Sequence, residues 1–217
     1  MQIPFKKVKI NVSTDKEVTG IMSQPLLKEE YYTYADYFKW DDGKRWELIE
    51  GKPYAMSPAP TWGHQGVQYE IARQLGNFLH GKPCKVFTAP FDVRLNADTG
   101  DDTVVQPDIV VICDRSKLIG TGCVGAPDMA VEVLSPSTAY HDTHVKFRLY
   151  HNAGVREYWI VNMNTQTVHV YILENGRYYT TSYGNTDVAP VSILEGCEID
   201  LREVFADAGE TESQEGS

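Results

Sequence analysis

Apolar positions along this chain recur with either helical or strand spacing. Helical spacing predicts a helix over residues 63–80, and Gly81 is the signal that ends it. Its apolar face comprises Val67, Ile71, Leu75, Phe78 and Leu79. A short amphipathic helix is predicted after Thr33 in YTYADYFKW, because Thr33 is a suitable N-cap. A third helix is predicted in STAYHDTHVKFRLYHNAG, ending at Gly154.

The remaining apolar segments are short, rich in β-branched residues and bounded by turn signals, which is typical of strands. One hairpin is predicted around Glu50-Gly51-Lys52-Pro53 and another at Asn175-Gly176. Two long strands, KVFTAPFDVRL and VVQPDIVVI, flank the turn-rich NADTGDDT, and a loop over 114–126 precedes DMAVEVL, a central strand. The last strand before the second hairpin is REYWIVNMN. This order predicts a mixed α/β (α+β) fold with a mixed central sheet, flanking helices and added N-terminal and C-terminal hairpins.

The length of 217 residues predicts one domain with short extensions. We expect the domain to span 29–206, after a partly ordered extension over 1–28 and before a disordered acidic tail over 207–217. No apolar run approaches the roughly 20 residues of a membrane span, and the first residues lack a secretory signal. A cytoplasmic protein without membrane contacts is therefore expected.

The charge and the cysteines exclude some classes of site. The formal net charge of −10 argues against a protein that coats nucleic acid through a basic surface. The four cysteines are scattered without a CxxC pair, and we interpret them as reduced, structural residues rather than disulfide partners or zinc ligands. They are Cys84, Cys113, Cys123 and Cys197.

Two carboxylates stand out in apolar strand segments. Asp108 opens DIVVI, and Glu132 lies inside MAVEVLS. Asp108 alone fits an exposed strand start, and Glu132 alone fits a structural ion pair, although a carboxylate costs several kcal/mol in such surroundings unless it is paired or metal-bound. If the two strands are neighbours, the acids converge, and a hard divalent cation, Mg²⁺ or Mn²⁺, would relieve their repulsion.

A cation near such a site is expected from the helix that follows. Asp142, Lys146 and Tyr150 are spaced four apart and share one helical face, whereas Leu134, two residues after Glu132, leaves no lysine on the strand. The alternative is an ordinary salt bridge between Asp142 and Lys146 on a solvated surface.

The ordered set RWELIEG, QPDIVV, PDMAVEVLSPST, D-x-x-x-K-x-x-x-Y and GVREYWIVN, with His64 after a Pro-rich turn, is similar to the Uma-type restriction endonuclease family. This family belongs to the PD-(D/E)XK nuclease superfamily, and the resemblance covers about residues 31–173. It implies a restriction-endonuclease-like core with a metal-dependent centre, in which Asp108 and Glu132 match the motif acids. The resemblance also implies that the motif lysine comes from the helix, as Lys146, because Leu134 occupies its usual place on the strand.

The resemblance adds further candidates. Glu47 in RWELIEG matches a recurrent acid and would be another metal ligand, or else a strand-edge residue beside Arg45. His64 would contact a phosphate or water, or else cap its helix. Glu70, on another face of that helix, is a weaker candidate.

The resulting hypothesis is hydrolysis of DNA phosphodiester bonds, with Asp108, Glu132 and Glu47 as metal ligands and Lys146 and His64 as further catalytic residues. Two alternatives stay open, namely a degenerate nuclease fold that only binds, and a metal-dependent hydrolase of another substrate. A basic rim would favour DNA; its candidate residues are Arg45, Lys85, Arg94, Arg148 and Arg156. Homodimerisation through the exposed hairpins stays open as well.

Overall fold

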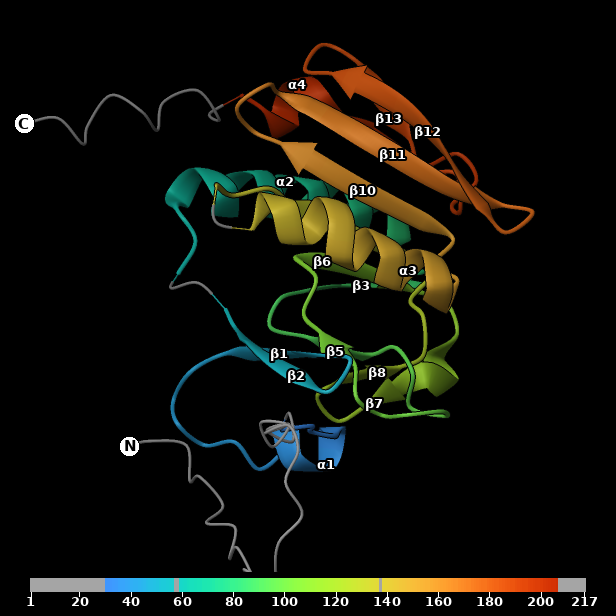
Figure 1. Cartoon of the computed structure of the whole chain (residues 1–217). Coiled ribbons are helices and arrows are strands. Elements are labelled where there is room, and N and C mark those ends of the chain that lie inside the picture. The colour runs from blue at the N-terminus through green and yellow to red at the C-terminus, as the bar shows by residue number, and fades with distance from the viewer. Residues whose placement is uncertain (1–29, 57–58, 137, 207–217) are drawn as a thin grey trace, which may run out of the picture.

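The structure is a computed structural model that describes residues 30–206 except 57, 58 and 137 (Figure 1). The predicted extension over 1–28 and the predicted tail over 207–217 lie outside the described residues. The elements in chain order are α1 (Tyr34–Tyr37), β1 (Trp46–Ile49), β2 (Lys52–Ala55), α2 (Trp62–Leu79), β3 (Lys85–Thr88), β4 (Asp92–Arg94), β5 (Val104–Val105), β6 (Ile109–Ile112), the 3₁₀ turn η1 (Arg115–Lys117), β7 (Leu118–Ile119), β8 (Gly122–Val124), β9 (Met129–Val133), the π-helical segment η2 (His141–Lys146), α3 (Phe147–Ala153), β10 (Glu157–Asn162), β11 (Thr167–Glu174), β12 (Arg177–Gly184), β13 (Val188–Pro190), β14 (Glu198–Asp200) and α4 (Leu201–Val204).

The described strands form two larger sheets and one small one. The central sheet has the strand order β12-β11-β10-β9-β6-β3, and it is mixed because only β9 and β10 run parallel. The second sheet has the order β2-β1-β5-β4-β8-β7, and β13 pairs with β14. The mixed central sheet with flanking helices and hairpins agrees with the prediction from the sequence.

Prolines divide the two predicted long strands, so that part of the prediction was wrong. KVFTAPFDVRL breaks at the cis peptide Ala89-Pro90 into β3 and β4, and VVQPDIVVI breaks before Asp108 into β5 and β6. Proline has no N–H to donate to a strand ladder, so pairing stops there. The halves then join different sheets, since β3 pairs with β6 while β4 pairs with β5. The predicted loop over 114–126 also contains a small hairpin, β7–β8.

Helices cover both faces of the central sheet, with α2 behind it and α3 in front in Figure 1. The predicted apolar face of α2 is confirmed, because Val67, Ile71, Leu75 and Leu79 are buried in one core cluster with Val131 of β9. The opposite face packs against α3 and the second sheet, in a cluster that comprises Ile49, Phe91, Val93, Val105, Val110, Ile112, Cys123, Ala130, Leu149, Tyr150, Val155, Tyr158 and Ile160. Side chains of β9 therefore alternate between two cores.

Both predicted hairpins are present. The turn between β1 and β2 uses Glu50 and Gly51 with φ of 50° and 76°, and the turn between β11 and β12 uses Asn175 and Gly176 with φ of 48° and 74°. Paired left-handed residues give the twist that joins adjacent antiparallel strands. The predicted third helix ends at Gly154, as expected, with φ of 84°.

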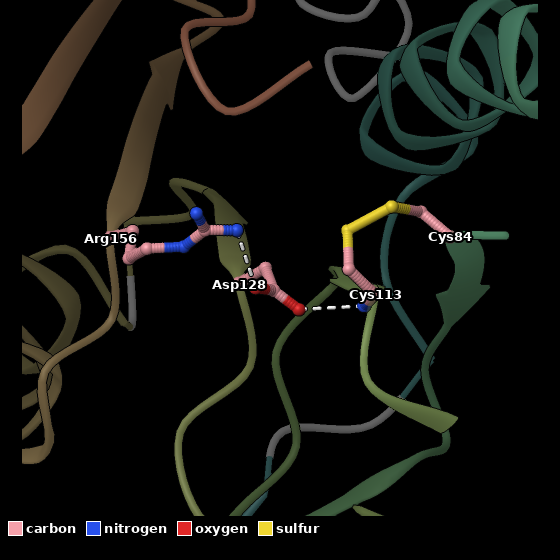
Figure 2. The surroundings of a disulfide bond; sticks show 4 residues. All are labelled: Cys84, Cys113, Asp128 and Arg156. Atoms are coloured by element: carbon pink, nitrogen blue, oxygen red, sulfur yellow. Dashed lines mark hydrogen bonds and ion pairs between the residues drawn. A yellow bond between two sulfur atoms is a disulfide. The ribbon is translucent and has the colours of Figure 1, made fainter. Parts of the chain in front are cut away.

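The prediction that all four cysteines are reduced was wrong. A disulfide joins Cys84, which directly precedes β3, to Cys113, which directly follows β6 (Figure 2). Lys85 pairs with Ile112, so the two cysteines lie opposite each other just beyond the ladder. This proximity arises from strand register and leaves no CxxC signal in the sequence. Cys123 and Cys197 are free and buried.

Within the part of the chain that the structure describes, no helix combines the length and apolar composition needed to cross a bilayer.

Candidate active site

Strand pairing brings Asp108 and Glu132 together. Ile109 of β6 lies opposite Val131 of β9, so Asp108, one residue earlier, meets Glu132, one residue later, at the same end of the antiparallel pair. The two strands are thus neighbours, which is the condition under which the acids were expected to converge. Glu132 follows the alternation of β9 and points away from Val131 and Val133 into the core beneath α3. It is only 3% exposed.

Glu132 receives two hydrogen bonds at a single oxygen. Lys146 Nζ donates to Glu132 Oε1 over 2.9 Å, and the Tyr150 hydroxyl donates to the same oxygen over 2.8 Å. Both donors come from the helical segment η2–α3, where their four-residue spacing places them on the face toward the sheet. The shared face of Lys146 and Tyr150 was predicted, and it converges on Glu132.

Lys146 lies among three carboxylates rather than on a solvated surface. Its Nζ is 2.9 Å from Glu132 Oε1, 3.0 Å from Glu47 Oε1 and 3.5 Å from Asp142 Oδ1. The lysine and Asp142 are 4% and 3% exposed. The alternative of an ordinary surface salt bridge is therefore wrong, because η2 packs this face against the ends of β1 and β9.

The electrostatics of this group follow from burial and crowding. Burial alone would lower the Lys146 pKa, but Glu132, Glu47 and Asp142 surround the ammonium and raise the pKa well above its usual value. Burial raises the pKa of Glu132 well above its usual value, and Lys146 offsets only part of that effect. Burial also raises the pKa of Asp142. Three carboxylates therefore share one ammonium, so a further positive charge would stabilise the group.

Glu47 enters this group from β1 and is held from behind. Its Oε1 accepts the backbone N–H of Gln106 over 2.8 Å as well as the bond from Lys146. At 4% exposure it is not an edge residue, and Arg45 instead donates to Gln106 Oε1 over 2.7 Å. The alternative of a strand-edge glutamate beside Arg45 is therefore wrong.

Gln106 is a positioning residue that sequence reasoning missed. Its side-chain Nε2 donates to Asp92 Oδ1 over 2.9 Å and to the Tyr37 hydroxyl over 3.1 Å, so both the main chain and the side chain are anchored. The residue is buried and directly precedes Pro107-Asp108. Its place before that dipeptide was the only signal in the sequence, because its contact with Glu47 depends on the pairing of β1 with β5.

Asp108 and His64 meet at the end of β9. The backbone N–H of Val133 donates to Asp108 Oδ2 over 2.8 Å, and His64 Nε2 lies 2.8 Å from Val133 O and 3.4 Å from Asp108 Oδ2. Thr61 caps α2 by accepting the His64 N–H, so His64 itself is not the cap. The helix-cap alternative for His64 is therefore wrong, while Asp108 keeps 18% of its side chain exposed.

The ionisation of His64 reflects opposing effects. Burial lowers its pKa, but hydrogen bonding and attraction to Asp108 outweigh burial and raise the pKa above its usual value. Among the described residues, His64 Nδ1 is buried without a hydrogen-bond partner.

His141 adds an imidazole that the sequence did not single out. Its Nδ1 lies 4.0 Å from Glu47 Oε2, and its ring packs on Tyr54 with centroids 5.2 Å apart. Burial lowers the pKa of His141, which favours the neutral imidazole. Glu70, in contrast, is not brought to the site, since its carboxylate binds Arg73 over 2.8 Å on the surface of α2.

The acids match a hard divalent cation in chemistry. Within the described ranges, no three histidine, cysteine, aspartate or glutamate side chains are arranged as a metal site. Magnesium is commonly held by one or two carboxylates, with waters and substrate phosphates completing its shell. Asp108 and Glu132 supply two carboxylates at adjacent strand ends, and three carboxylates surround the single ammonium of Lys146.

The fold and the group of Asp108, Glu132 and Lys146 define a nuclease-like α+β protein. The sequence model of the Uma2 family, described as "Putative restriction endonuclease", matches residues 31–202. The chain belongs to this family, as its resemblance to the Uma-type endonucleases indicated.

Individual proteins also resemble the chain. An uncharacterized protein of Synechocystis sp. is 30% identical over 139 residues, which cover 63% of this chain and 71% of that protein. The crystal structure of a putative nuclease belonging to DUF820 from Anabaena variabilis superposes with a TM-score of 0.66 at 20% identity, covering 81% of this chain and 98% of that one. The likeness to this structure shows a shared fold.

Proposed function

We propose that this protein is a metal-dependent endonuclease that hydrolyses phosphodiester bonds in DNA. The observation that carries the proposal is the convergence of Asp108 and Glu132 from paired strands, with the Lys146 ammonium 2.9 Å from Glu132. Membership of a family described as restriction endonucleases supports nucleic acid as the substrate. A cytoplasmic location and a homodimer remain part of the hypothesis.

In this proposal Asp108 and Glu132 hold Mg²⁺ or Mn²⁺, with Glu47 as an additional ligand. The bound cation would polarise the scissile phosphate and lower the pKa of a water molecule. Glu132 is suited to this role because Lys146 and Tyr150 both bind Oε1 and so restrict its rotation. Asp108 is restricted in the same way by the N–H of Val133.

Lys146 has an electrostatic role in the proposal. Its raised pKa keeps the ammonium charged at neutral pH, where it favours the ionised form of Glu132 against burial and offsets negative charge that develops at phosphorus. His64, 3.4 Å from Asp108, would hold that carboxylate in position and reach a phosphate oxygen or water when protonated. These groups lie on α2, β1, β9 and η2 and directly before β6, so the site needs the packed fold.

The test is cleavage of supercoiled plasmid with Mg²⁺ or Mn²⁺ by the wild type, Asp108→Ala and Glu132→Ala. Glu70→Ala is the matched control, because it removes an ion-paired carboxylate of α2 outside the site. We expect metal-dependent nicking by the wild type and the control, and a loss of at least about 100-fold in the two site variants.

Circular dichroism would verify that all four proteins fold. Full cleavage by both folded site variants would overturn the proposed ligands. A wild type that cuts neither plasmid nor oligonucleotides with either metal would overturn the endonuclease proposal in favour of a binding function.

A further inference from the structure

The basic residues expected to form a DNA-binding rim are largely engaged with other side chains. Arg94 pairs with Asp101 over 2.8 Å, and Arg148 pairs with Glu50 over 3.1 Å. Two more follow the same pattern, since Arg156 pairs with Asp128 over 2.6 Å (Figure 2) and Arg45 donates to Gln106. Among the described residues, these four arginines therefore offer little free positive charge to duplex phosphates, and the net charge of the full sequence is −10.

Aromatic side chains are instead exposed beside the catalytic candidates. Tyr54 is 40% exposed and packs on His141, which lies 4.0 Å from Glu47. Tyr140 directly precedes His141 and is 73% exposed, with one ring face against His144 at a centroid distance of 4.6 Å. Tyr54 thus reaches the acidic group through His141, and Tyr140 is the neighbour of that histidine in the chain.

Trp62 extends this surface from a different helix. It is the first residue of α2, two before His64, and it is 55% exposed. Figure 1 shows α2 beginning beside the start of the helical segment that leads into α3, and His64 reaches Val133 O across this junction. Exposures of 40% to 73% are too high for core residues, so packing does not explain these three rings.

Planar rings at a phosphodiesterase site offer a specific kind of contact. The faces of nucleobases are hidden by stacking in a duplex, but they are open in single strands, where aromatic side chains stack on them without regard to sequence. A site with few free cations and several free rings gains more affinity from base faces than from phosphate charges.

We propose that the site takes unpaired nucleotides, in single-stranded or locally opened DNA, by stacking bases on Tyr54, Trp62 and Tyr140. This inference rests on the proposed nuclease function, because it names the state of the substrate. The weak sequence preference of stacking means that the structure of the DNA, rather than its sequence, governs binding by this surface. Its salt dependence is shallow, because few counterions are released.

The test is fluorescence anisotropy with a labelled single-stranded oligonucleotide and the duplex of the same sequence. The full-length protein is used with Ca²⁺, which takes the same oxygen ligands as Mg²⁺. We expect the single strand to bind at least about tenfold more tightly, and Kd to change little between about 50 and about 200 mM salt. Trp62→Ala, Tyr140→Ala and Tyr54→Ala should each weaken single-strand binding roughly 5- to 100-fold.

Tyr179→Ala is the matched control, because Tyr179 is 55% exposed on β12, outside this surface. Equal or tighter duplex binding that the three aromatic variants leave unchanged would overturn the inference. The inference is also overturned if the variants only turn a dimer into a monomer in light scattering, which would make the surface an interface between copies.

Cleavage of the same oligonucleotides separates this inference from the proposed function. If Asp108→Ala abolishes cleavage while the aromatic variants cut and bind like the wild type, the nuclease proposal is supported and the stacking surface is ruled out. If no oligonucleotide is cut but single-strand binding depends on Trp62, the stacking surface is supported and the nuclease proposal is ruled out.

Discussion

Lys146 and Glu132 form a buried ion pair, with Nζ 2.9 Å from Oε1 and both side chains at most 5% exposed. The pair is not balanced, because Glu47 and Asp142 also approach the same ammonium. Desolvating charged groups is costly, so the Lys146 ammonium stabilises whatever negative charge these acids carry beneath η2, although burial still raises the pKa values of Glu132 and Asp142. This imbalance governs both the stability of the group and its affinity for a cation.

Replacing Lys146 with methionine should destabilise the protein by about 3–5 kcal/mol, because it leaves the surrounding carboxylates without their shared cation. Urea unfolding followed by tryptophan fluorescence measures the change. The double variant Lys146→Met/Glu132→Gln should recover part of the loss, since one of the buried acids is then neutral, yet remain inactive. Equal stabilities of the wild type and the single variant would contradict the ion pair.

Tyr150→Phe should shift the acidic limb of the cleavage profile to higher pH. The Tyr150 hydroxyl donates to Glu132 Oε1 over 2.8 Å and favours the carboxylate, so its removal raises the Glu132 pKa further and keeps the acid protonated at higher pH. The free energy of unfolding should fall by about 1–3 kcal/mol, because a buried hydrogen bond is lost. Initial rates across a pH series, together with urea unfolding, measure both effects.

Tyr158→Phe is the control, because its buried hydroxyl donates to the backbone oxygen of Asp142 over 3.0 Å and not to Glu132. It should lose comparable stability without moving the pH profile. Identical shifts in the two variants would show that Tyr150 acts only through packing.

Metal binding should release protons and tighten as pH rises. Burial raises the pKa values of Glu132 and Asp142, so the metal-free site retains protons that a cation must displace. Calorimetry with Mg²⁺ or Mn²⁺ in two buffers of different ionisation enthalpy measures the number released. Glu132→Gln should bind weakly and release fewer protons, and the same release from this variant would argue against Glu132 as a ligand.

Several features of the site could be predicted from the sequence because they depend on local spacing. Asp108 and Glu132 are recognisable where apolar β-branched neighbours predict buried strands. The common face of Lys146 and Tyr150 follows from helical geometry. Sequence could not decide between a solvated and a buried position for that face, because the answer depends on how η2 packs on β9.

Long-range pairing explains what was missed. Glu47 reaches Lys146 because β1 pairs with β5, where Leu48 meets Val104, and the same pairing brings Gln106 behind it. No local pattern encodes that register. The strand breaks at Pro90 and Pro107, unlike this register, do have a local signal, namely the proline itself. The prediction of two long strands gave too little weight to the missing N–H of proline.

His64 should make stability decline as pH rises through its folded pKa. That pKa is raised above the usual 6.5 by Asp108 despite burial, so the folded state binds the proton more tightly. The stabilisation is complete below the unfolded pKa and disappears above the folded one. Urea midpoints at about pH 6 and about pH 9 should therefore differ more in the wild type than in His64→Gln. His144→Gln, at an exposed position, is the control and should behave like the wild type.

The disulfide should stabilise the fold without affecting catalysis. It closes a segment with a sequence separation of 29, which in the chain-entropy description is worth about 3–4 kcal/mol. Cys84→Ser/Cys113→Ser should lower the urea midpoint accordingly, and a reductant should lower that of the wild type but not that of the double variant. Cys113 follows the last residue of β6 and Asp108 precedes the first, so about 17 Å of strand separates them. Metal-dependent cleavage by the folded double variant should therefore match the wild type, and a loss of cleavage with folding intact would mean that β6 couples its two ends.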